Sequence, residues 1–534
     1  MKSFENLSIR EKIGQTMIFR SIEIEKLREK LGSLEDVFER YPIGGVFIGS
    51  EVIKNVENRF EEARNLIKGY QDASRIPLVI CGDFESGCGA SLKGMTEFSS
   101  IMGVAATESE GLAYGFGKGL ALEAGSIGIH WAFGPVSDLN INPKNQATNV
   151  RSAGDNPEKV LRVLRSIVKG MQENGLSATA KHFPGDGIDW RNPHVATGCI
   201  NLSKEAWYQK HGKIFKALID EGVDTIMTGH IAFPAFQKER MYGNPFPCTL
   251  SKELTTDLLK DEMGFEGVVV SDALNMGGYL EWYEDEMDAH VKCFESGCDM
   301  LLWVPFEYLD RIEKEINNGN ILMDRLNDAC AKVFELKKNR GVFSKENYGF
   351  FDLTSKQTEE IRNTTVSIAE GSIALVRDRN NMLPLSKDKI KRVLYIAATV
   401  SGSRSRMGFL KEELEKRGIE VEMRDVLRIY EFCEIADDFD LVIFGFSNRG
   451  YGVVDFASHG LLSQRILWSA LSYAKLKTII ISFGTPYIHN EYFKNAPVCI
   501  NAYFDTQEIQ SAAIKALFGE IPFKGTIPVD CSNI

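Results

Sequence analysis

The chain has 534 residues, of which 44% are hydrophobic and 25% are charged, and its formal net charge is −12. This size and composition are typical of a globular protein with about two or three domains. The negative charge is spread along the chain without basic clusters, which argues against nucleic acid and anionic membranes as main partners. A small neutral substrate fits this charge better.

The first residues lack the apolar core of a signal peptide, and no later segment has about twenty uncharged apolar residues in a row. We therefore expect a cytoplasmic protein. The ten cysteines are scattered and include no Cys-x-x-Cys pair, so we expect buried thiols rather than a zinc site or a disulfide framework. No metal or cofactor is predicted.

In the first part of the chain, short apolar runs alternate with amphipathic segments such as 161–168, whose apolar residues have helical spacing. Repeated alternation of this kind predicts a (β/α) barrel, and a doubly wound open sheet is the alternative. The predicted strands are 45–48, 77–81, 130–133, 177–180, 225–227, 267–270 and 300–303.

Polar residues follow several of these strands. Asp83, Lys181, His182, His230 and Asp272 all come where an apolar run stops. In a barrel the ends of several strands deliver catalytic groups to one rim, so we expect these side chains to converge. Taken alone, an aspartate at the position of Asp272 is also typical of a helix N-cap.

The segment that begins at Lys181 is rich in proline and glycine up to Gly187, and His194 follows seven residues later. Proline and glycine residues in this number interrupt regular structure, so His182 and His194 are predicted to bracket a mobile loop at a strand end. Loops of this kind often carry function.

A charged, polar stretch near 335–365 breaks the pattern and predicts a linker. A second α/β unit follows, with strands at 392–396, 441–444, 478–482 and 498–501 and a helix at 409–417 that ends at Gly418. This unit has no phosphate-binding glycine fingerprint and reads as a structural platform. The predicted domains are 1–340, a linker at 341–370, and 371–534.

An ordered series of motifs covers nearly the whole chain and resembles family 3 of the glycoside hydrolases, in its β-N-acetylhexosaminidase branch. The segments that carry the resemblance include Phe133-Gly134-Pro135-Val136-Ser137-Asp138, Arg151-Ser152, Lys181-His182-Phe183-Pro184-Gly185, Gly229-His230-Ile231 and Ser271-Asp272-Ala273-Leu274-Asn275-Met276. No single segment is decisive, but their order is specific.

The resemblance implies a (β/α)8 TIM-like barrel followed by a smaller flavodoxin-like α/β sandwich. It also implies a retaining, exo-acting β-N-acetylglucosaminidase that forms a covalent glycosyl-aspartate intermediate. Asp272 matches the family's nucleophile and His194 its loop acid/base, since an imidazole with a pKa near 6.5 gives and retakes a proton near neutrality. The substrate-binding residues that it implies are Asp83, Arg151, Lys181, His182, His230 and Asp138.

The chain departs from the family pattern at two places. Asn192 stands where an aspartate is expected to pair with the catalytic histidine; an amide can orient the ring but supplies no charge. Slower catalysis, substitution by Asp186 or Asp189, and loss of hydrolysis are all open, and we favour an active enzyme in which Asp189 assists. The second departure, at residues 85–88, lacks an arginine and a glycine of the hexosaminidases and weakens the expected N-acetyl preference.

Several alternatives stay open. Within the family, β-glucosidase or β-xylosidase activity uses the same nucleophile motif, and a neutral histidine does not repel phosphate, so a phosphorylase is the third variant. A metal-dependent barrel hydrolase is disfavoured because the strand at 45–48 carries no ligand. A carbohydrate-binding homologue with impaired catalysis would also explain the departures. We expect a small saccharide as partner and a monomer or homodimer.

Overall fold

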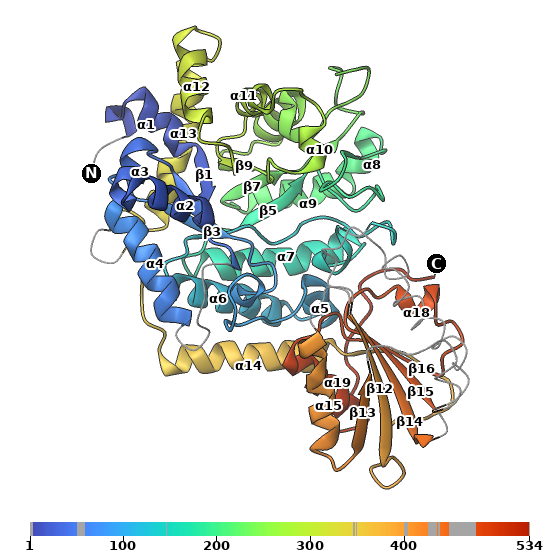
Figure 1. Cartoon of the computed structure of the whole chain (residues 1–534). Helices are drawn as coiled ribbons and strands as arrows, with labels where there is room; N and C mark the ends of the chain where they lie inside the picture. Colours follow the sequence, from blue (N-terminus) through green and yellow to red (C-terminus); the bar gives the residue numbers. More distant parts are fainter. Residues whose placement is uncertain are drawn as a thin grey trace. The chain divides into compact units, whose positions relative to one another are not determined.

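The chain folds into two compact units (Figure 1). The first comprises Met1–Thr96, Tyr114–Asp138 and Leu164–Glu360, and the second comprises Glu97–Ala113, Leu139–Val163 and Ile361–Ile534. The structure, a computed structural model, describes residues 4–50, 59–145, 147–344, 348, 350–399, 404–424, 435, 438–447 and 477–532. Within these ranges, no helix has the length and apolar character needed to span a membrane.

Parallel strands form the centre of the first unit. A five-stranded sheet has the order β10-β1-β2-β3-β4 and a three-stranded sheet the order β5-β7-β9, with every pairing parallel. Isolated parallel bridges join Trp131 to Ser177 and Val270 to Met300. The strands are β1 (Met17–Arg20), β2 (Gly45–Phe47), β3 (Val79–Gly82), β4 (Trp131–Ala132), β5 (Thr179–Phe183), β7 (Thr225–Thr228), β9 (Val268–Ser271) and β10 (Leu301–Leu302), with a separate parallel pair β6 (Gly198–Cys199) and β8 (Ile231–Ala232).

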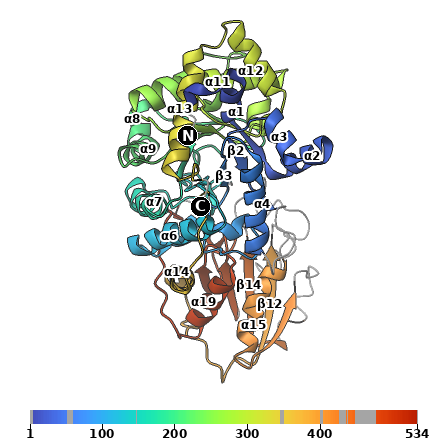
Figure 2. The same ribbon diagram turned by 90° about the vertical axis from the view of Figure 1, so that its left-hand side faces the viewer.

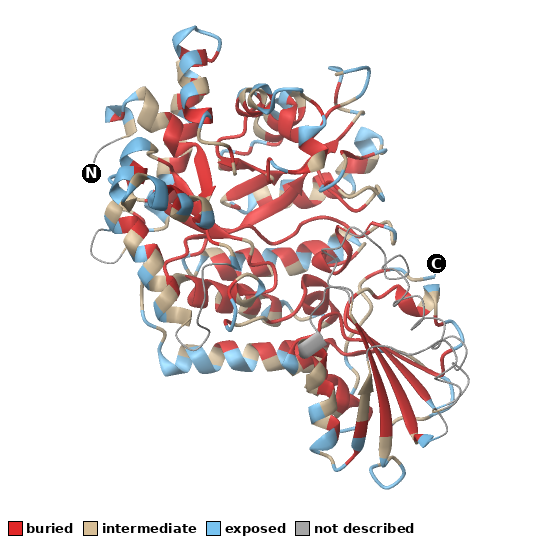
Figure 3. Ribbon diagram, in the orientation of Figure 1, coloured by how far each residue is buried: buried red, intermediate tan, exposed pale blue. Residues whose placement is uncertain are grey.

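Helices lie outside these strands, as Figures 1 and 2 show. In α9 (His211–Asp220), Ile214, Phe215 and Leu218 are buried on one stripe, which is how an amphipathic helix covers a sheet. Strands β5, β7 and β9 are buried along their length, in red in Figure 3. The other helices are η1 (Phe4–Asn6), α1 (Ile9–Gln15), α2 (Ser21–Leu31), α3 (Leu34–Arg40), α4 (Arg59–Ala73), η3 (Cys88–Ala90), α6 (Glu110–Ser126), α7 (Pro157–Gln172), α8 (Lys204–Tyr208), η5 (Cys248–Leu250), η6 (Glu253–Glu262), α10 (Gly277–Leu280), α11 (Glu286–Ser296), α12 (Tyr308–Asn317) and α13 (Met323–Asn339).

Two features of this unit differ from the sequence prediction. Strand β1 was not predicted, although it pairs with both β2 and β10; its apolar run, Met17 to Phe19, is short and lies between two helices. Strand β5 continues to Phe183, so Lys181 and His182 lie on the strand and not on the loop after it. Both polar side chains are buried and paired with carboxylates, which makes their place on a buried strand possible.

The second unit is built on a six-stranded sheet of order β11-β16-β15-β14-β12-β13, in which only the β11–β16 pairing is antiparallel. Alternate residues of its central strands enter different hydrophobic clusters: Tyr395 and Ile443 belong to one, Ile396 and Phe444 to the other. Both faces of the sheet are therefore covered, as continuous apolar strands require. The elements are α5 (Ile101–Ala106), η4 (Asn149–Arg151), α14 (Ser355–Ser372), β11 (Ala374–Asp378), β12 (Arg392–Thr399), η7 (Arg404–Met407), α15 (Gly408–Glu415), β13 (Glu420–Arg424), β14 (Leu441–Ser447), β15 (Thr478–Ser482), α18 (Ile488–Glu491), β16 (Val498–Asn501) and α19 (Gln507–Leu517).

The mixed α/β class with parallel sheets is confirmed, and so is the helix predicted at 409–417, which is α15. Helix α14 covers much of the stretch predicted as linker. Among the described cysteines, Cys199 and Cys531 are partly exposed free thiols and the others are buried, as expected; Cys433 lies outside the described residues.

Candidate active site

A buried lysine joins two strand ends of the first unit. Lys181 lies on β5 with only 3% of its side chain exposed, and its Nζ is 3.0 Å from Asp83 Oδ1 and 2.7 Å from Glu85 Oε1. Both carboxylates belong to the segment that follows β3. A buried ammonium is costly unless it is paired in this way, so the lysine and the acidic pair depend on each other.

His182, the next residue on β5, joins two further carboxylates. Its Nδ1 is 2.7 Å from Asp138 Oδ2, and its Nε2 is 4.0 Å from Asp272 Oδ2. Asp138 Oδ1 also accepts the backbone N–H groups of His182, at 3.0 Å, and Asp186, at 2.7 Å. Because a carboxylate accepts but does not donate, Nδ1 carries a proton and Nε2 is turned towards Asp272.

A strand irregularity brings these two neighbours to one cluster. In a regular strand, successive side chains point to opposite faces. The register of β5 against β7 shifts between Lys181 and Phe183, at His182. Such irregularities re-aim side chains and are common next to active sites, which explains how both Lys181 and His182 contact carboxylates of the same cluster.

Asp272 follows β9 directly. Its N–H donates to Thr228 O at 3.0 Å, and its Oδ1 accepts the N–H of Ala273 at 2.7 Å. Burial by itself raises the pKa of Asp272, but the neighbouring His182 and His230 and the Ala273 N–H outweigh burial and hold that pKa below its usual value. The carboxylate is therefore ionised at neutral pH. It does not cap the next helix, since Met276 occupies the N-cap position of α10.

His230 lies behind the cluster and is fully buried. Its Nε2 donates to Ala273 O at 3.0 Å, and its Nδ1 is 3.0 Å from Thr249 Oγ1. Burial lowers the pKa of His230, so the ring is neutral at neutral pH. Both ring nitrogens are thus used to hold the residue next to Asp272, and direct binding of substrate by His230 stays a prediction.

The segment 189–199, here called the acid loop, carries His194 exposed to solvent. The ring Nδ1 of His194 is 2.7 Å from Asn192 Oδ1, which also accepts the His194 N–H at 3.0 Å. Asn192 therefore orients the imidazole through Nδ1, although it contributes no charge. Asp189 accepts from Arg191 Nε at 2.7 Å and from the Cys199 N–H at 2.9 Å, which ties the base of the loop together. Its assistance to His194 stays a prediction.

The acid loop lies against the segment that follows Asp272. Gly277 N–H donates to His194 O at 3.0 Å, and Gly278 N–H donates to Pro193 O at 3.2 Å. Asp272 and His194 are thus carried by neighbouring segments of the same unit, which is a requirement for two groups that act on one bound sugar.

Arg151 belongs to the second unit. It ends η4, is 9% exposed, and donates from its guanidinium to Ala147 O at 2.6 Å. Its role towards a substrate stays a prediction.

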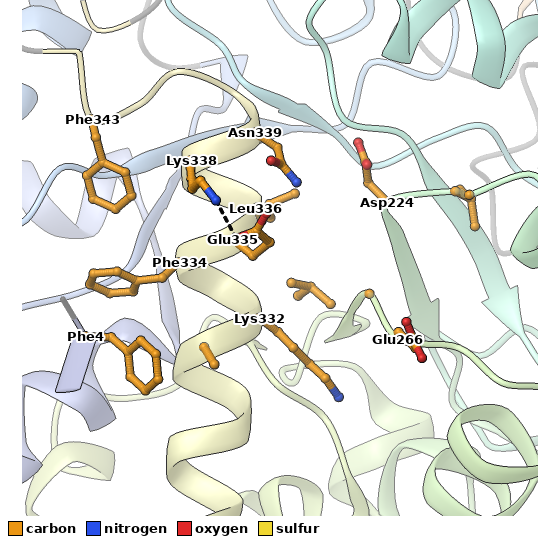
Figure 4. A pocket seen from close by; sticks show the side chains of 15 residues that line it. Phe4, Asp224, Glu266, Lys332, Phe334, Glu335, Leu336, Lys338, Asn339 and Phe343 are labelled. Carbon is orange, nitrogen blue, oxygen red and sulfur yellow. Dashed lines mark hydrogen bonds and ion pairs between the residues drawn. The ribbon is translucent and has the colours of Figure 1, made fainter.

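Two cavities lie at different ends of the strands. One of about 450 Å³ borders the acid loop and is lined by Arg191, Cys199, Tyr242 and Trp282 among others. The other, of about 710 Å³, adjoins the segments that precede β7 and β9; Figure 4 shows the rings of Phe4, Phe334 and Phe343 on one side and the carboxylates of Asp224 and Glu266 on the other. Lys181, His182 and Asp272 lie at the opposite ends of the strands, so the larger cavity is away from this cluster.

Sequence reasoning missed Glu85 as a partner of Lys181. The signal was present as Asp83-Phe84-Glu85, two carboxylates in alternation after an apolar strand. Around Lys181 and His182 the cluster holds Asp83, Glu85, Asp138 and Asp272, so carboxylates outnumber the cations. An excess of negative charge stabilises a transition state that develops positive charge.

A parallel α/β unit that gathers an ionised aspartate, a paired lysine and histidines beside its strand ends has the arrangement of an α/β enzyme. The chain belongs to glycosyl hydrolase family 3: the pattern of that family's N-terminal domain matches residues 8–336. The chain is accordingly a glycoside hydrolase, and the resemblance seen in the sequence is confirmed.

Relatives of known activity cover almost the whole chain. A β-N-acetylglucosaminidase/β-glucosidase of Cellulomonas fimi is 28% identical over 97% of this chain and 93% of its own length. Among solved structures, the β-glucoside phosphorylase BglX has a TM-score of 0.84 at 28% identity, over 99% of this chain and 94% of that one. A family 3 β-N-acetylglucosaminidase from Paenibacillus sp. str. FPU-7 has a TM-score of 0.82 at 25% identity, over 99% of this chain and 100% of that one.

Proposed function

We propose that the protein is a retaining, exo-acting β-N-acetylglucosaminidase that removes terminal β-linked N-acetylhexosamine from cell-wall or chitin-type saccharides. Asp272 attacks the anomeric carbon, and His194 protonates the leaving oxygen and later activates water. The cluster of Lys181, His182 and Asp83 holds the hydroxyl groups of the terminal sugar. Asp138 fixes the His182 ring.

The observation that carries this proposal is the state of Asp272. It is an ionised carboxylate at the end of β9, 4.0 Å from a histidine that is itself oriented by Asp138. The carboxylates around it suit an oxocarbenium-like transition state, which bears positive charge. The Cellulomonas fimi relative supports N-acetylglucosamine, and glucose as a second glycone.

The same proposal includes the closure of the barrel and the type of the second unit. We propose that the two parallel sheets of the first unit close into a (β/α)8 barrel, with the bridges Trp131–Ser177 and Val270–Met300 in support. We also propose that the six-stranded sheet of the second unit is a flavodoxin-like sandwich. The domain limits remain 1–340 and 371–534, with a linker at 341–370. The partner is a small saccharide, and the protein acts in the cytoplasm as a monomer or homodimer.

The direct test is a screen of aryl β-glycosides of N-acetylglucosamine, glucose and xylose. We expect turnover to be highest on N-acetylglucosamine, with the β-anomer as first product. Faster release from glucose or xylose would make the protein a β-glucosidase or β-xylosidase instead. Sugar binding by calorimetry without release of any aglycone would mark a binding homologue.

The role of His194 has its own test. Replacement of His194 by Ala removes the proton donor, so turnover should fall by about 10²-fold or more on a disaccharide whose leaving group needs protonation. Turnover of a dinitrophenyl glycoside, whose leaving group departs as an anion, should fall much less. Equal losses on both substrates would argue against an acid role.

A second candidate is phosphorolysis, favoured by one observation. The His194 ring is held at Nδ1 by the neutral amide of Asn192, and this amide adds no negative charge that would repel a phosphate acceptor. The BglX structure is that of a β-glucoside phosphorylase. Addition of inorganic phosphate to the aryl glycoside assay decides: a phosphorylase releases sugar 1-phosphate, and a hydrolase releases free sugar only.

A further inference from the structure

We propose that Thr197, Glu281 and Trp282 form a latch that positions the acid loop, and hence His194, against the segment after the nucleophile. The inference rests on the proposed role of His194 and adds the residues on which that role depends. None of the three residues needs to contact the sugar; each acts through the loop.

Thr197 makes the central contacts of the latch. Its N–H donates to Glu281 Oε1 at 2.8 Å, and Trp282 Nε1–H donates to its hydroxyl at 2.7 Å. The hydroxyl lies 2.6 Å from Glu281 Oε1 and 2.7 Å from Gly278 O. A hydroxyl has one proton and two lone pairs, so it donates to one of these acceptors at a time while it accepts from the indole. The Thr197 side chain is thus held between Glu281, Gly278 and Trp282.

The backbone contacts of Gly277 and Gly278 continue the latch towards His194. An added Cβ at Gly277 would lie 2.3 Å from Val195 O, and one at Gly278 would lie 2.7 Å from Pro193 O. Any larger residue at either position would push the acid loop away. The glycine pair therefore allows the close approach that the hydrogen bonds then fix.

Around His194 the acid loop is open to solvent. His194 is exposed, 57% of Val195 is accessible to solvent, and the stretch from Ala196 to Cys199 borders the cavity of about 450 Å³. Gly198 and Cys199 at the end of the loop pair with β8, and the part from Pro193 to Thr197 is held by its hydrogen bonds to residues 277–282. The latch is consequently the structural origin of the His194 placement.

Placement matters because a proton donor acts only within hydrogen-bond reach of the leaving oxygen. A displacement of about 1 Å costs roughly 10²-fold in rate. This loss of rate affects only substrates whose leaving group must be protonated. A glycoside whose leaving group departs unprotonated is insensitive to it, and this difference separates loss of position from loss of fold.

The experiment compares Thr197→Val and Glu281→Ala with the wild type on two aryl glycosides of the preferred sugar, dinitrophenyl and 4-methoxyphenyl. Valine keeps the shape of threonine and removes the hydroxyl; Glu281 is exposed, so its truncation leaves the core intact. We expect kcat/KM to fall by about 10-fold to 100-fold for methoxyphenyl and by less than about threefold for dinitrophenyl. For Thr197→Val, kcat/KM for methoxyphenyl should also fall by a smaller factor on the alkaline side of its pH profile.

The matched control is Thr225→Val. Thr225, at the other end of the strands, also accepts from a tryptophan, Trp131 Nε1 at 2.9 Å, and donates to a backbone carbonyl, Ala178 O at 2.8 Å. This variant should unfold at a lower temperature and leave the ratio of the two substrates unchanged. A latch variant that keeps the wild-type ratio, or that loses both substrates equally, overturns the proposal.

The parallel measurement on His194→Ala separates this failure from failure of the proposed function. If His194→Ala shows the leaving-group effect and the latch variants do not, the latch is refuted while the acid role stands. If His194→Ala shows no such effect, the acid role fails, and the latch fails with it.

Discussion

The two ends of the strands in the first unit bury polar groups in different ways. At the carboxyl ends, Lys181, His182 and Asp272 are ionic or titratable and are paired with other charged groups. At the amino ends, Trp131 Nε1 donates to the hydroxyls of Thr179, at 2.8 Å, and Thr225, at 2.9 Å, in a cluster without charged groups. A buried carboxylate at the same end, Asp299, precedes β10 and is paired with Lys260 and Arg325.

The difference reflects what each end does. Neutral hydrogen-bonded groups are satisfied within the protein and cost little to bury, so the amino end contributes to stability. Charges at the carboxyl end are expensive to bury and depend on each other, and they keep atoms such as His182 Nε2 and Asp272 Oδ2 directed at one place. Substitutions at the carboxyl end should therefore change activity most, and substitutions at the amino end should change stability alone.

The largest effect is expected at Asp272. Asp272→Ala removes the attacking carboxylate, so kcat should fall on the order of 10⁴-fold or more, the scale on which central catalytic groups act in other hydrolases. Added azide should restore release of the aglycone, because a small anion can enter from the face that the carboxylate leaves. The product should be the α-glycosyl azide, measurable by NMR.

An exposed carboxylate provides the control for this change. Asp257 on η6 has a side chain that is 50% exposed and pairs with Lys252, so Asp257→Asn should keep wild-type kinetics. A β-glycosyl azide from Asp272→Ala, or turnover close to that of the wild type, would remove Asp272 from the role of nucleophile.

The next effect is expected at Lys181. Lys181→Met leaves the buried Glu85 without the lysine that pairs with it, so unfolding free energy should fall by about 3–5 kcal/mol and kcat/KM by roughly 10²-fold. In the double variant Lys181→Met/Glu85→Gln the buried negative charge that had paired with Lys181 is gone. Stability measured in urea should then recover in part, while activity stays low. Recovery of both together would mean that Lys181 serves the fold only.

Much of the carboxyl end could be predicted from the sequence. Apolar runs that stop at Asp83, Lys181 and Asp272 predicted parallel strands with polar ends, and the structure places these residues beside β3, on β5 and after β9. The prediction that an amide at position 192 can orient His194 is confirmed by the Asn192–His194 hydrogen bond. A local sequence pattern is enough to predict a site residue when the end of its own strand sets its position.

Other parts depend on contacts that no local pattern contains. Lys181 and Asp83 are 98 positions apart in the chain, and Thr197 is 84 positions from Glu281, so neither the length of β5 nor the latch follows from periodicity. Strand β1 is too short to stand out between helices. Its identity as a strand comes from pairing with β2 and β10 on its two edges.

A smaller effect, confined to stability, is expected at the amino end. Trp131→Phe removes the indole N–H that joins Thr179 and Thr225 and leaves a small void, so unfolding free energy should fall by about 1–3 kcal/mol. Folded enzyme should retain its kcat and KM, because these hydroxyls face away from the rim that carries Asp272. A change in KM with no change in the urea midpoint would show that the two ends are coupled.

The smallest and most specific effect concerns Lys337, a cation buried near the amino end, where Nζ donates to Gln15 Oε1 at 2.6 Å. Burial lowers the pKa of Lys337 from 10.5 to about 7. Below pH 7 both the folded and the unfolded chain carry the proton, and the folded state bears the full cost of the buried charge. Between pH 7 and 10.5 only the unfolded chain carries it, so this group makes stability rise with pH.

Lys337→Met should therefore gain stability relative to wild type at pH 6 and lose most of that gain at pH 9, a difference of at most about 3 kcal/mol. Urea midpoints of both proteins at the two pH values measure it. Lys338→Met, at a neighbouring side chain that is 65% exposed, should show the same gap from wild type at both. If Lys337→Met also keeps a constant gap, Lys337 is solvated in the folded protein and carries no cost of burial.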